Sequence, residues 1–255
     1  MKVIILCGGS GTRLREQTEF IPKPLIPIGP FPMVVHIMKL YAHYGFREFV
    51  LALGYKQEKF KEYFLHYDQI NNDITLNLGS FRGEPYHGHY QDNWRVTLVD
   101  TGESTMKGAR LKRVERYVGN TFFLTYGDSI GDVDIKSLLS FHQSHGKLVT
   151  VTGVHPQARF GELHVEGDVC RSFTEKPENG DCWVNGGFMV MNRGVFDYLS
   201  PDEWCDLEVG ALELIASKGE MRVWKHGGYW GCCDTLKELD DLNRLWREGK
   251  ARWRI

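Results

Sequence analysis

Short apolar runs alternate with amphipathic segments through the first half of the chain. Residues 3–6, 49–53 and 122–126 form continuous apolar runs that are typical of strands buried on both faces of a sheet. Segments with apolar side chains at helical spacing lie between the strands, at 33–44, 57–67, 106–117 and 135–145. Further strands are expected at 74–78, 96–100 and 149–154. This alternation predicts βαβ units and a mostly parallel, Rossmann-like sheet flanked by helices.

The pattern is less regular in the last third of the chain. Residues 161–177 alternate apolar and polar side chains between turn signals, which predicts hairpins, and residues 187–191 read as a strand. Helices are expected at 206–218 and 236–246, whereas 79–93 reads as a long excursion from the sheet. The sequence therefore predicts one α/β domain over residues 1–255 with a smaller, irregular β-rich part.

Composition narrows the class of protein. The 255 residues carry a formal net charge of −2 and are 42% apolar, so a sizeable core is expected and no bulk field draws the chain to nucleic acid. No apolar run reaches the length of a membrane span, and the first residues read as a strand rather than a signal peptide. The six cysteines form no C-x-x-C pair, which favours reduced thiols in a cytoplasmic protein.

A glycine-rich loop follows the first strand and is the first candidate for chemistry. Gly8, Gly9 and Gly11 leave room for a phosphate to approach the backbone, and Arg13 could bind phosphate oxygens. The loop is not a Walker motif, and a tight strand-to-helix turn is the plainer alternative. Lys23 lies just downstream, between two prolines that stiffen the backbone. A solvent-exposed lysine would not need such a rigid backbone, which favours a functional role.

Two aspartates stand at the ends of predicted elements. Asp128 directly follows the strand at 122–126, where the active edge of a parallel sheet is expected, although it could simply begin a turn. Asp234 precedes the last helix, and we expect it to serve as the N-cap of that helix. Asp132 and Asp134 read as turn and helix-start residues.

Taken in order, these segments resemble the signature of the sugar-1-phosphate nucleotidyltransferases. The similarity begins with 8–14 and 22–25, and it extends nearly from end to end. Within that family the chain most resembles the branch of glucose-1-phosphate cytidylyltransferases, through 94–102 and 104–111. The remaining matching segments are 126–128, 159–161, 175–177, 185–187 and 234–235.

The resemblance implies a role for each matching position. The catalytic set is Arg13, Lys23, Asp128 and Lys176. The set that binds CTP, with Thr105 and Arg110 around the cytosine, comprises Leu6, Gly8, Gly9, Gly11, Thr12, Arg13, Lys23, Thr105, Arg110 and Gly127. The sugar 1-phosphate would be bound by Lys176, Glu175, Asn185 and Gly186. Asp128 and Asp234 would hold Mg²⁺ as cofactor, so that Asp234 would serve both as N-cap and as ligand.

The implied reaction transfers a cytidylyl group from CTP to a sugar 1-phosphate, by default glucose 1-phosphate, and releases pyrophosphate. Residues 1–130 would bind mainly the nucleotide and 131–255 mainly the sugar phosphate, in a homo-oligomer such as a hexamer. Gly29 to Pro32 and the segment 208–212 depart from the family pattern, which leaves the acceptor open. The alternatives are UTP or dTTP as donor, a heptose or non-sugar phosphate as acceptor, and a non-catalytic nucleotide sensor.

Overall fold

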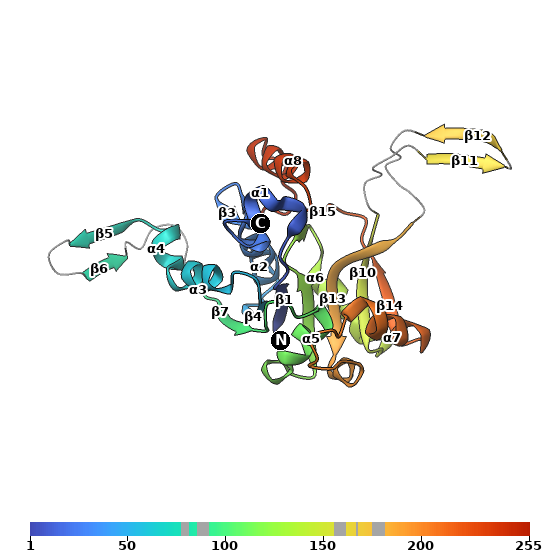
Figure 1. Ribbon diagram of the computed structural model, residues 1–255, viewed down its shortest axis with the longest axis horizontal. Helices are drawn as coiled ribbons and strands as arrows, with labels where there is room; N and C mark the ends of the chain where they lie inside the picture. The colour runs from blue at the N-terminus through green and yellow to red at the C-terminus, as the bar shows by residue number, and fades with distance from the viewer. Residues whose placement is uncertain (78–81, 86–91, 156–161, 167, 175–181) are drawn as a thin grey trace.

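A seven-stranded sheet forms the centre of the computed structural model, which describes residues 1–77, 82–85, 92–155, 162–166, 168–174 and 182–255 (Figure 1). Strand β13 is antiparallel to both of its neighbours, β10 and β8, and the other adjacent pairs are parallel. In sheet order the strands are β14 (Met221–Lys225), β10 (Val149–Val154), β13 (Val184–Asn192), β8 (Thr121–Tyr126), β1 (Val3–Cys7), β4 (Glu48–Leu53) and β7 (Arg95–Asp100). The predicted mostly parallel α/β sheet is confirmed.

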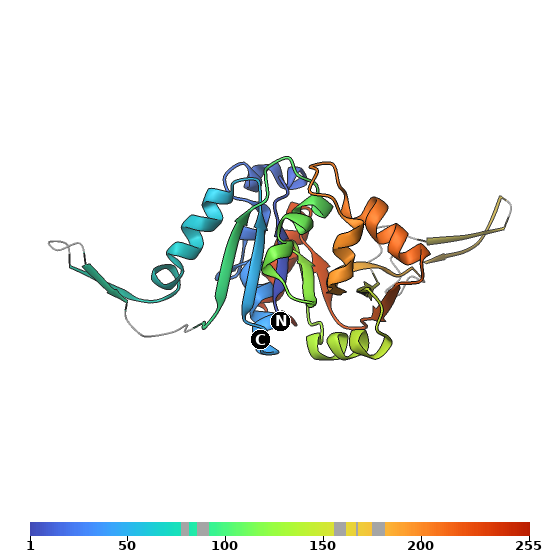
Figure 2. The same ribbon diagram turned by 90° about the horizontal axis from the view of Figure 1, so that it is seen from below.

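Helices cover both faces of this sheet (Figure 2). Because successive strand residues point to opposite faces, Val3 and Ile5 of β1 pack into one apolar cluster while Ile4 and Leu6 pack into the other. The first face is covered by α2 (Met33–His43), α3 (Gln57–Leu65), α6 (Ile135–His145) and α8 (Leu236–Arg247). The second is covered by α5 (Lys107–Arg113), η4 (Arg193–Tyr198), the π-type turn η5 (Leu207–Leu212) and α7 (Glu213–Ser217).

Two hairpins extend away from the sheet on opposite sides (Figure 1). One pairs β5 (Ile74–Asn77) with β6 (Arg82–Pro85) after α4 (Tyr67–Asn71), and the other pairs β11 (Glu162–Glu166) with β12 (Val169–Thr174). The second confirms the hairpin expected within 161–177. The strand expected at 74–78 exists, but it pairs with β6 rather than joining the parallel sheet.

Two helices are shorter than the pattern suggests. The helix expected at 106–117 ends at Arg113, and η3 (Glu115–Tyr117) follows it, because a 3-10 turn keeps nearly the same apolar spacing. The helix expected at 206–218 is broken where Val209 and Gly210 leave the helical region, the glycine with a φ of 105°. The chain therefore forms η5 and the short α7 instead of one continuous helix.

Short elements after β1 and β8 build the edge where these two strands end. After β1 they are η1 (Thr12–Leu14), α1 (Arg15–Thr18), η2 (Lys23–Leu25), β2 (Pro27–Ile28) and β3 (Phe31–Pro32). After β8 comes β9 (Ser129–Gly131), which pairs antiparallel with β15 (Trp230–Cys232). None of β9, β14 and β15 was predicted, because each is short and lacks a long apolar run.

No helix in the described part of the chain combines the length and apolar character that crossing a bilayer requires.

Candidate active site

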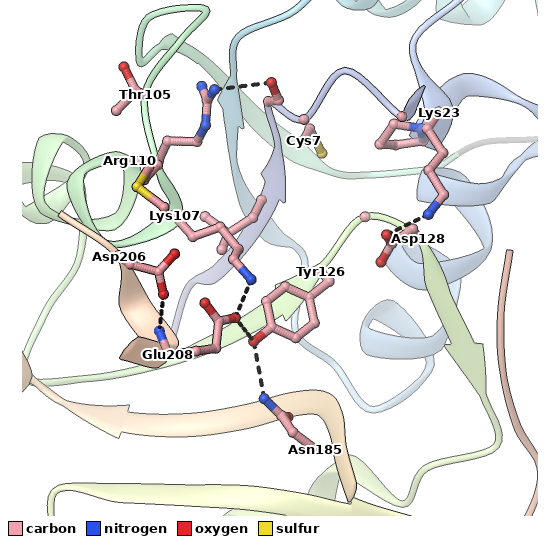
Figure 3. Close-up of a pocket in the computed structure, with 17 residues that line it drawn as sticks. Cys7, Lys23, Thr105, Lys107, Arg110, Tyr126, Asp128, Asn185, Asp206 and Glu208 are labelled. Atoms are coloured by element: carbon pink, nitrogen blue, oxygen red, sulfur yellow. Dashed lines mark hydrogen bonds and ion pairs between the residues drawn. The ribbon is translucent and has the colours of Figure 1, made fainter. Parts of the chain in front are cut away.

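A pocket with a volume of about 470 Å³ lies at the carboxyl ends of β1 and β8 (Figure 3). Strand β1 has β4 as its neighbour on one side and β8 on the other. In open α/β sheets, ligands bind beyond the carboxyl ends of the strands at a point where the strand order changes direction in this way. The lining residues are Leu6, Cys7, Gly8, Gly9, Gly11, Lys23, Pro24, Thr105, Met106, Lys107, Arg110, Tyr126, Gly127, Asp128, Asn185, Asp206 and Glu208.

The glycine loop packs closely against its neighbours. A Cβ on Gly8 would lie 2.2 Å from the Arg110 guanidinium, and a Cβ on Gly127 would lie 2.8 Å from the Pro24 ring. Gly127 also donates its N–H to the carbonyl of Leu6 at 3.0 Å, which holds the loops after β1 and β8 together. Gly11 has a φ of +64° and thus a conformation that favours glycine. These positions need glycine for packing and backbone conformation, whether or not a phosphate is bound.

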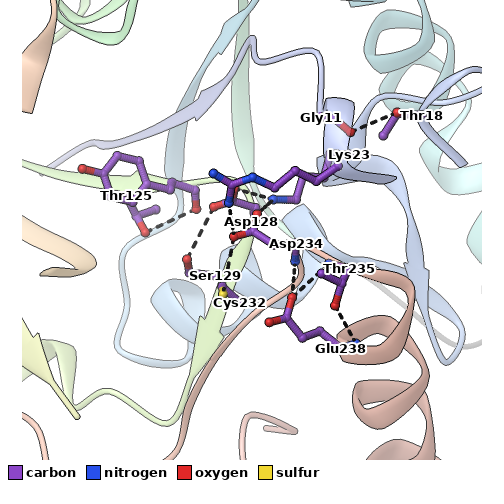
Figure 4. A network of polar contacts seen from close by, with 12 residues as sticks. Gly11, Thr18, Lys23, Thr125, Asp128, Ser129, Cys232, Asp234, Thr235 and Glu238 are labelled. Carbon is purple, nitrogen blue, oxygen red and sulfur yellow. Dashed lines mark hydrogen bonds and ion pairs between the residues drawn. The ribbon is translucent and has the colours of Figure 1, made fainter. Parts of the chain in front are cut away.

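Lys23 lies between the two candidate metal ligands (Figure 4). Its Nζ is 2.7 Å from Asp128 Oδ2 and 2.6 Å from Asp234 Oδ1, and Arg13 Nη1 is 3.0 Å from Asp234 Oδ2. We call these four side chains the carboxylate–lysine cluster. Lys23 is buried, whereas Arg13 is largely exposed. The structure thus brings together four residues that the sequence placed far apart.

Strand pairing explains why the two aspartates meet. Ser129 of β9 is paired with Cys232 of β15, and the N–H of Cys233 donates to the carbonyl of Asp128 at 3.1 Å. This ladder places Asp234 directly beside the end of β8. The loop after a sheet strand and the segment before α8 therefore present their carboxylates to the same ammonium group.

Asp234 does not cap α8, contrary to expectation. The N-cap is Thr235, whose Oγ1 accepts from the N–H of Glu238 at 3.3 Å. Glu238 Oε2 accepts in return from the N–H groups of Thr235 at 2.9 Å and Asp234 at 2.7 Å, which completes a capping box. The carboxylate of Asp234 is therefore directed to Lys23 and Arg13 rather than to the helix terminus. Asp134, by contrast, caps α6 as expected, since its side chain accepts from the N–H of Ser137.

The two aspartates suit a hard divalent cation that is shared with a substrate. A cationic group, the Lys23 ammonium, is already held between them. The described residues include no group of three or more His, Cys, Asp or Glu side chains that could hold a metal ion by themselves. Mg²⁺ commonly takes one or two carboxylates and completes its shell with water and phosphate oxygens. The donor set fits such an ion and does not fit a resident all-protein metal cage.

Lys23 is held in its charged form. Burial lowers its pKa, but the charges and hydrogen bonds of Asp128 and Asp234 outweigh burial, and the net pKa is raised. A raised folded-state pKa means that the stabilisation is fully present below the ordinary lysine pKa and is lost only at higher pH.

We therefore expect the stability difference between wild type and Lys23→Met to stay constant from about pH 6 to 9. It should shrink only as the pH rises through about 10.5, where an unperturbed lysine is half deprotonated. Urea unfolding at stepped pH measures this. A difference that already shrinks between pH 7 and 9 would show that the ammonium is not stabilised by the two carboxylates.

Arg110 lines the pocket, but its guanidinium is engaged within the protein. It donates to the carbonyls of Leu53 at 3.1 Å, Gly102 at 2.5 Å, Gly8 at 3.0 Å and Glu103 at 2.8 Å. A further bond reaches Thr101 Oγ1 at 2.9 Å. Arg110 thus joins the loops after β1, β4 and β7 beneath the pocket, and its contact with a nucleobase stays a prediction.

The remaining residues that were predicted to bind the nucleotide or the sugar do not all line the pocket. Thr105 lines the pocket, and its Oγ1 accepts from Arg113 Nη1 at 2.9 Å. Asn185 also lines it. Gly186 is buried in β13, where a Cβ would lie 2.7 Å from a methyl carbon of Val154, so its small size serves the packing of the sheet. Glu175 and Lys176 lie outside the described residues.

Sequence reasoning missed the wall of the pocket opposite the glycine loop. Lys107, Tyr126, Asp206 and Glu208 all line it. Lys107 Nζ and Tyr126 Oη both donate to Glu208 Oε1, at 2.5 and 2.6 Å. Tyr126 could have been found as the last residue of the strand before Gly127. Glu208 could not, because its segment read as ordinary helix.

The vicinal cysteines beside Asp234 are protonated thiols. Burial, the largest cause, raises the pKa of Cys232 to about 11 and that of Cys233 to about 12. All six cysteines of the chain are free.

Comparisons with known proteins give a consistent result. The family described as Nucleotidyl transferase matches residues 2–230. The chain is 43% identical over 256 residues to a probable glucose-1-phosphate cytidylyltransferase of Bacillus subtilis, covering 100% of both chains. It is also 43% identical over 258 residues to the glucose-1-phosphate cytidylyltransferase of Salmonella typhi, covering 100% of this chain and 99% of the relative. Among solved structures, a putative glucose-1-phosphate thymidylyltransferase of Bacillus anthracis shares the fold, with a TM-score of 0.70 at 21% identity over 99% of this chain and 95% of that one.

Proposed function

The chain belongs to the nucleotidyl transferase family, and we propose that it transfers a cytidylyl group from CTP to glucose 1-phosphate, forming CDP-glucose and pyrophosphate. The assignment of donor and acceptor rests on the full-length similarity to glucose-1-phosphate cytidylyltransferases. The observation that carries the chemistry is the convergence of Lys23, Asp128 and Asp234 at the end of β8 beside the glycine loop.

In the proposed reaction, a phosphate oxygen of the sugar 1-phosphate attacks the α-phosphorus of CTP in line with the departing pyrophosphate. Both reactants are anions, and the attacking phosphate needs no general base. The protein must therefore position the two reactants and neutralise their charge. The cationic side chains of Lys23 and Arg13, beside the glycine-lined pocket, suit that task.

Each group of the carboxylate–lysine cluster has a separate part in this proposal. Asp128 and Asp234 would hold Mg²⁺, which supplies charge neutralisation on phosphate oxygens when bound. Lys23, fixed in its charged form, would contact the phosphates near the reacting centre. Arg13, exposed and close to Asp234, would bind the leaving pyrophosphate. Lys176 would contact the phosphate of the sugar 1-phosphate.

The nucleotide would lie along the glycine loop. The main chain of Leu6, Gly8 and Gly9 would contact base and ribose, with Thr105 nearby, while Gly11 and Thr12 would contact the triphosphate. Arg110 would lie beside the cytosine with Thr105, and its five hydrogen bonds within the protein would hold the loops that form the base site. Asn185, together with Glu175, would contact hydroxyls of the sugar.

We also propose that residues 1–255 act as one domain, since the pocket is lined by residues of both halves of the chain. A homo-oligomer, such as the hexamer expected above, would provide packing for the two projecting hairpins, because isolated two-stranded hairpins are marginally stable. The free cysteines support a reducing compartment such as the cytoplasm.

The proposal predicts a defined outcome for a matrix of donors and acceptors. CTP, UTP, dTTP and GTP would each be incubated with glucose, mannose and a heptose 1-phosphate and with Mg²⁺, and pyrophosphate release would be followed. We expect the highest kcat/KM for CTP with glucose 1-phosphate, by at least about 100-fold over the other pairs. A different best pair would replace the assigned substrates. Nucleotide binding by calorimetry without product from any pair would favour the non-catalytic sensor.

A further inference from the structure

A chain of hydrogen bonds crosses the pocket wall and ends on Glu208 (Figure 3). Glu208 Oε1 accepts from both Lys107 Nζ and Tyr126 Oη. Glu208 Oε2 is buried, and it receives no hydrogen bond from any residue in the described part of the chain. A buried acceptor without a donor is costly, and the Glu208 side chain as a whole is 31% exposed and lines the pocket. A small rotation of the carboxylate would therefore bring this oxygen to a donor that a bound ligand supplies.

The direction of these hydrogen bonds shows that the missing group is a hydrogen-bond donor. The N–H of Gly187 donates to Asn185 Oδ1 at 2.9 Å, and Asn185 Nδ2 donates to Tyr126 Oη at 3.1 Å. Burial, and then the adjacent charge of Glu208, raise the pKa of Tyr126, so its hydroxyl keeps its proton and donates onward. Every hydrogen bond in this series therefore donates toward Glu208. Only a further donor can satisfy the remaining oxygen of its carboxylate.

The carboxylate is held in place by the turn that carries it. Asp206 Oδ1 accepts from the N–H groups of Glu208 and Val209, both at 2.8 Å. The turn also lies against α5, because a Cβ on Gly108 would be 2.7 Å from the carbonyl oxygen of Asp206. The backbone that carries Glu208 is thus fixed beside the pocket.

The position of Glu208 indicates which part of the substrates it faces. Lys23 and Asp128 lie on one side of the pocket, Thr105 and Arg110 lie on the other, and the loop at Cys7 runs between them (Figure 3). Glu208, Tyr126 and Asn185 form the wall across from that loop. If phosphates and base lie along the loop, the space next to Glu208 is left for the acceptor.

We infer that Glu208 Oε2 accepts a hydrogen bond from a hydroxyl of the acceptor sugar and is a specificity-determining residue for the sugar 1-phosphate. This inference rests on the proposed function. A ribose hydroxyl or the amino group of cytosine could offer the same chemistry, and the experiment below separates these donors.

Glu208→Gln is the informative variant. Lys107 and Tyr126 both donate, so the glutamine carbonyl oxygen should take the place of Oε1, and the amide nitrogen should take the place of Oε2. An acceptor facing the ligand thereby becomes a donor of nearly the same shape. We expect KM for glucose 1-phosphate to rise about 10- to 100-fold, the effect of losing one charge-assisted hydrogen bond, while KM for CTP changes little.

Deoxy analogues identify the hydroxyl. Among glucose 1-phosphates that each lack one hydroxyl, wild type should discriminate about 10- to 100-fold against the analogue that lacks the hydroxyl bound by Glu208. Glu208→Gln should lose the discrimination against that analogue alone. Glu213→Gln is the matched control, since Glu213 is an exposed residue outside the pocket, and it should behave as wild type. Calorimetric binding of glucose 1-phosphate to wild type and Glu208→Gln gives a readout that does not require turnover.

Four results would overturn the inference. They are an unchanged KM for glucose 1-phosphate with unchanged discrimination, a lost preference for CTP over 2′-deoxy-CTP, a lost preference for CTP over UTP, and equal calorimetric affinity of wild type and variant. The second would place the ribose at Glu208, and the third would place the cytosine there. Failure of the proposed function would look different, since wild type would then release no pyrophosphate from any pair.

Discussion

Asp128→Asn and Asp234→Asn are each expected to fold and to lower kcat by about 10²- to 10³-fold, a loss typical of removing one charge-stabilising group from an active site. Asparagine keeps the shape of the side chain but removes the negative charge that holds a cation. Both carboxylates are partly exposed, at 36% and 24%, so the loss of an ion pair with Lys23 should cost only about 1 kcal/mol of stability.

The two substitutions should also be non-additive. If both carboxylates hold one ion, losing either removes most of its effect, and the double variant should be little worse than each single one. Asp134→Asn is the matched control, since asparagine also serves well as the N-cap of α6 and the residue lies outside the pocket. Initial-rate kinetics with CTP and glucose 1-phosphate measure all four variants. Two single variants within a few-fold of wild type would exclude the shared ion.

Arg110→Met is expected to destabilise the fold more than any other substitution considered. Methionine fills much of the same volume but leaves four carbonyl groups without a charged donor, two of them without any other hydrogen bond recorded in the described part of the chain. Hydrogen bonds to charged groups contribute about 1.5–3 kcal/mol each, and partial relaxation suggests a net loss of about 3 kcal/mol. For a chain of this size, that corresponds to a fall in Tm of roughly 6–12 °C.

Arg116→Met is the matched control for this effect. Arg116 is exposed and bonds only to the hydroxyl of the adjacent Tyr117 among the described residues, so its replacement should change stability by less than about 0.5 kcal/mol. Chemical denaturation followed by tryptophan fluorescence measures both variants. If Arg110→Met were as stable as Arg116→Met, the loops after β1, β4 and β7 would not depend on this guanidinium.

The long apolar runs of the sequence allowed most of the central sheet to be predicted. The strands at 3–6, 49–53 and 122–126 are correct to within a residue at each end, because a strand buried on both faces leaves a continuous apolar signal. Edge strand β14 left a weaker signal, since Arg222 and Val223 are exposed and only part of the strand is covered. The pairing of β5 with β6 could not be predicted, because the spacing of apolar residues within a strand does not determine which other strand it pairs with.

The candidate site was predictable in part. The rule that parallel strands place ligands at their carboxyl ends located Asp128, while Asp234 was brought to the same place only through the family resemblance. Asp234 was wrongly predicted as the N-cap of α8, because Asp and Thr are both favourable N-cap residues. The glutamate three residues after Thr235 was the deciding signal for a capping box. Glu208 stayed hidden because Gly210 breaks a segment that otherwise has helical spacing.

The most direct test is a crystal structure with a non-hydrolysable CTP analogue and Mn²⁺, recorded at the manganese absorption edge. We predict one strong anomalous peak that contacts carboxylate oxygens of both Asp128 and Asp234 and a phosphate oxygen of the nucleotide. A triphosphate bound away from Lys23, or a manganese ion that touches neither aspartate, would contradict the account.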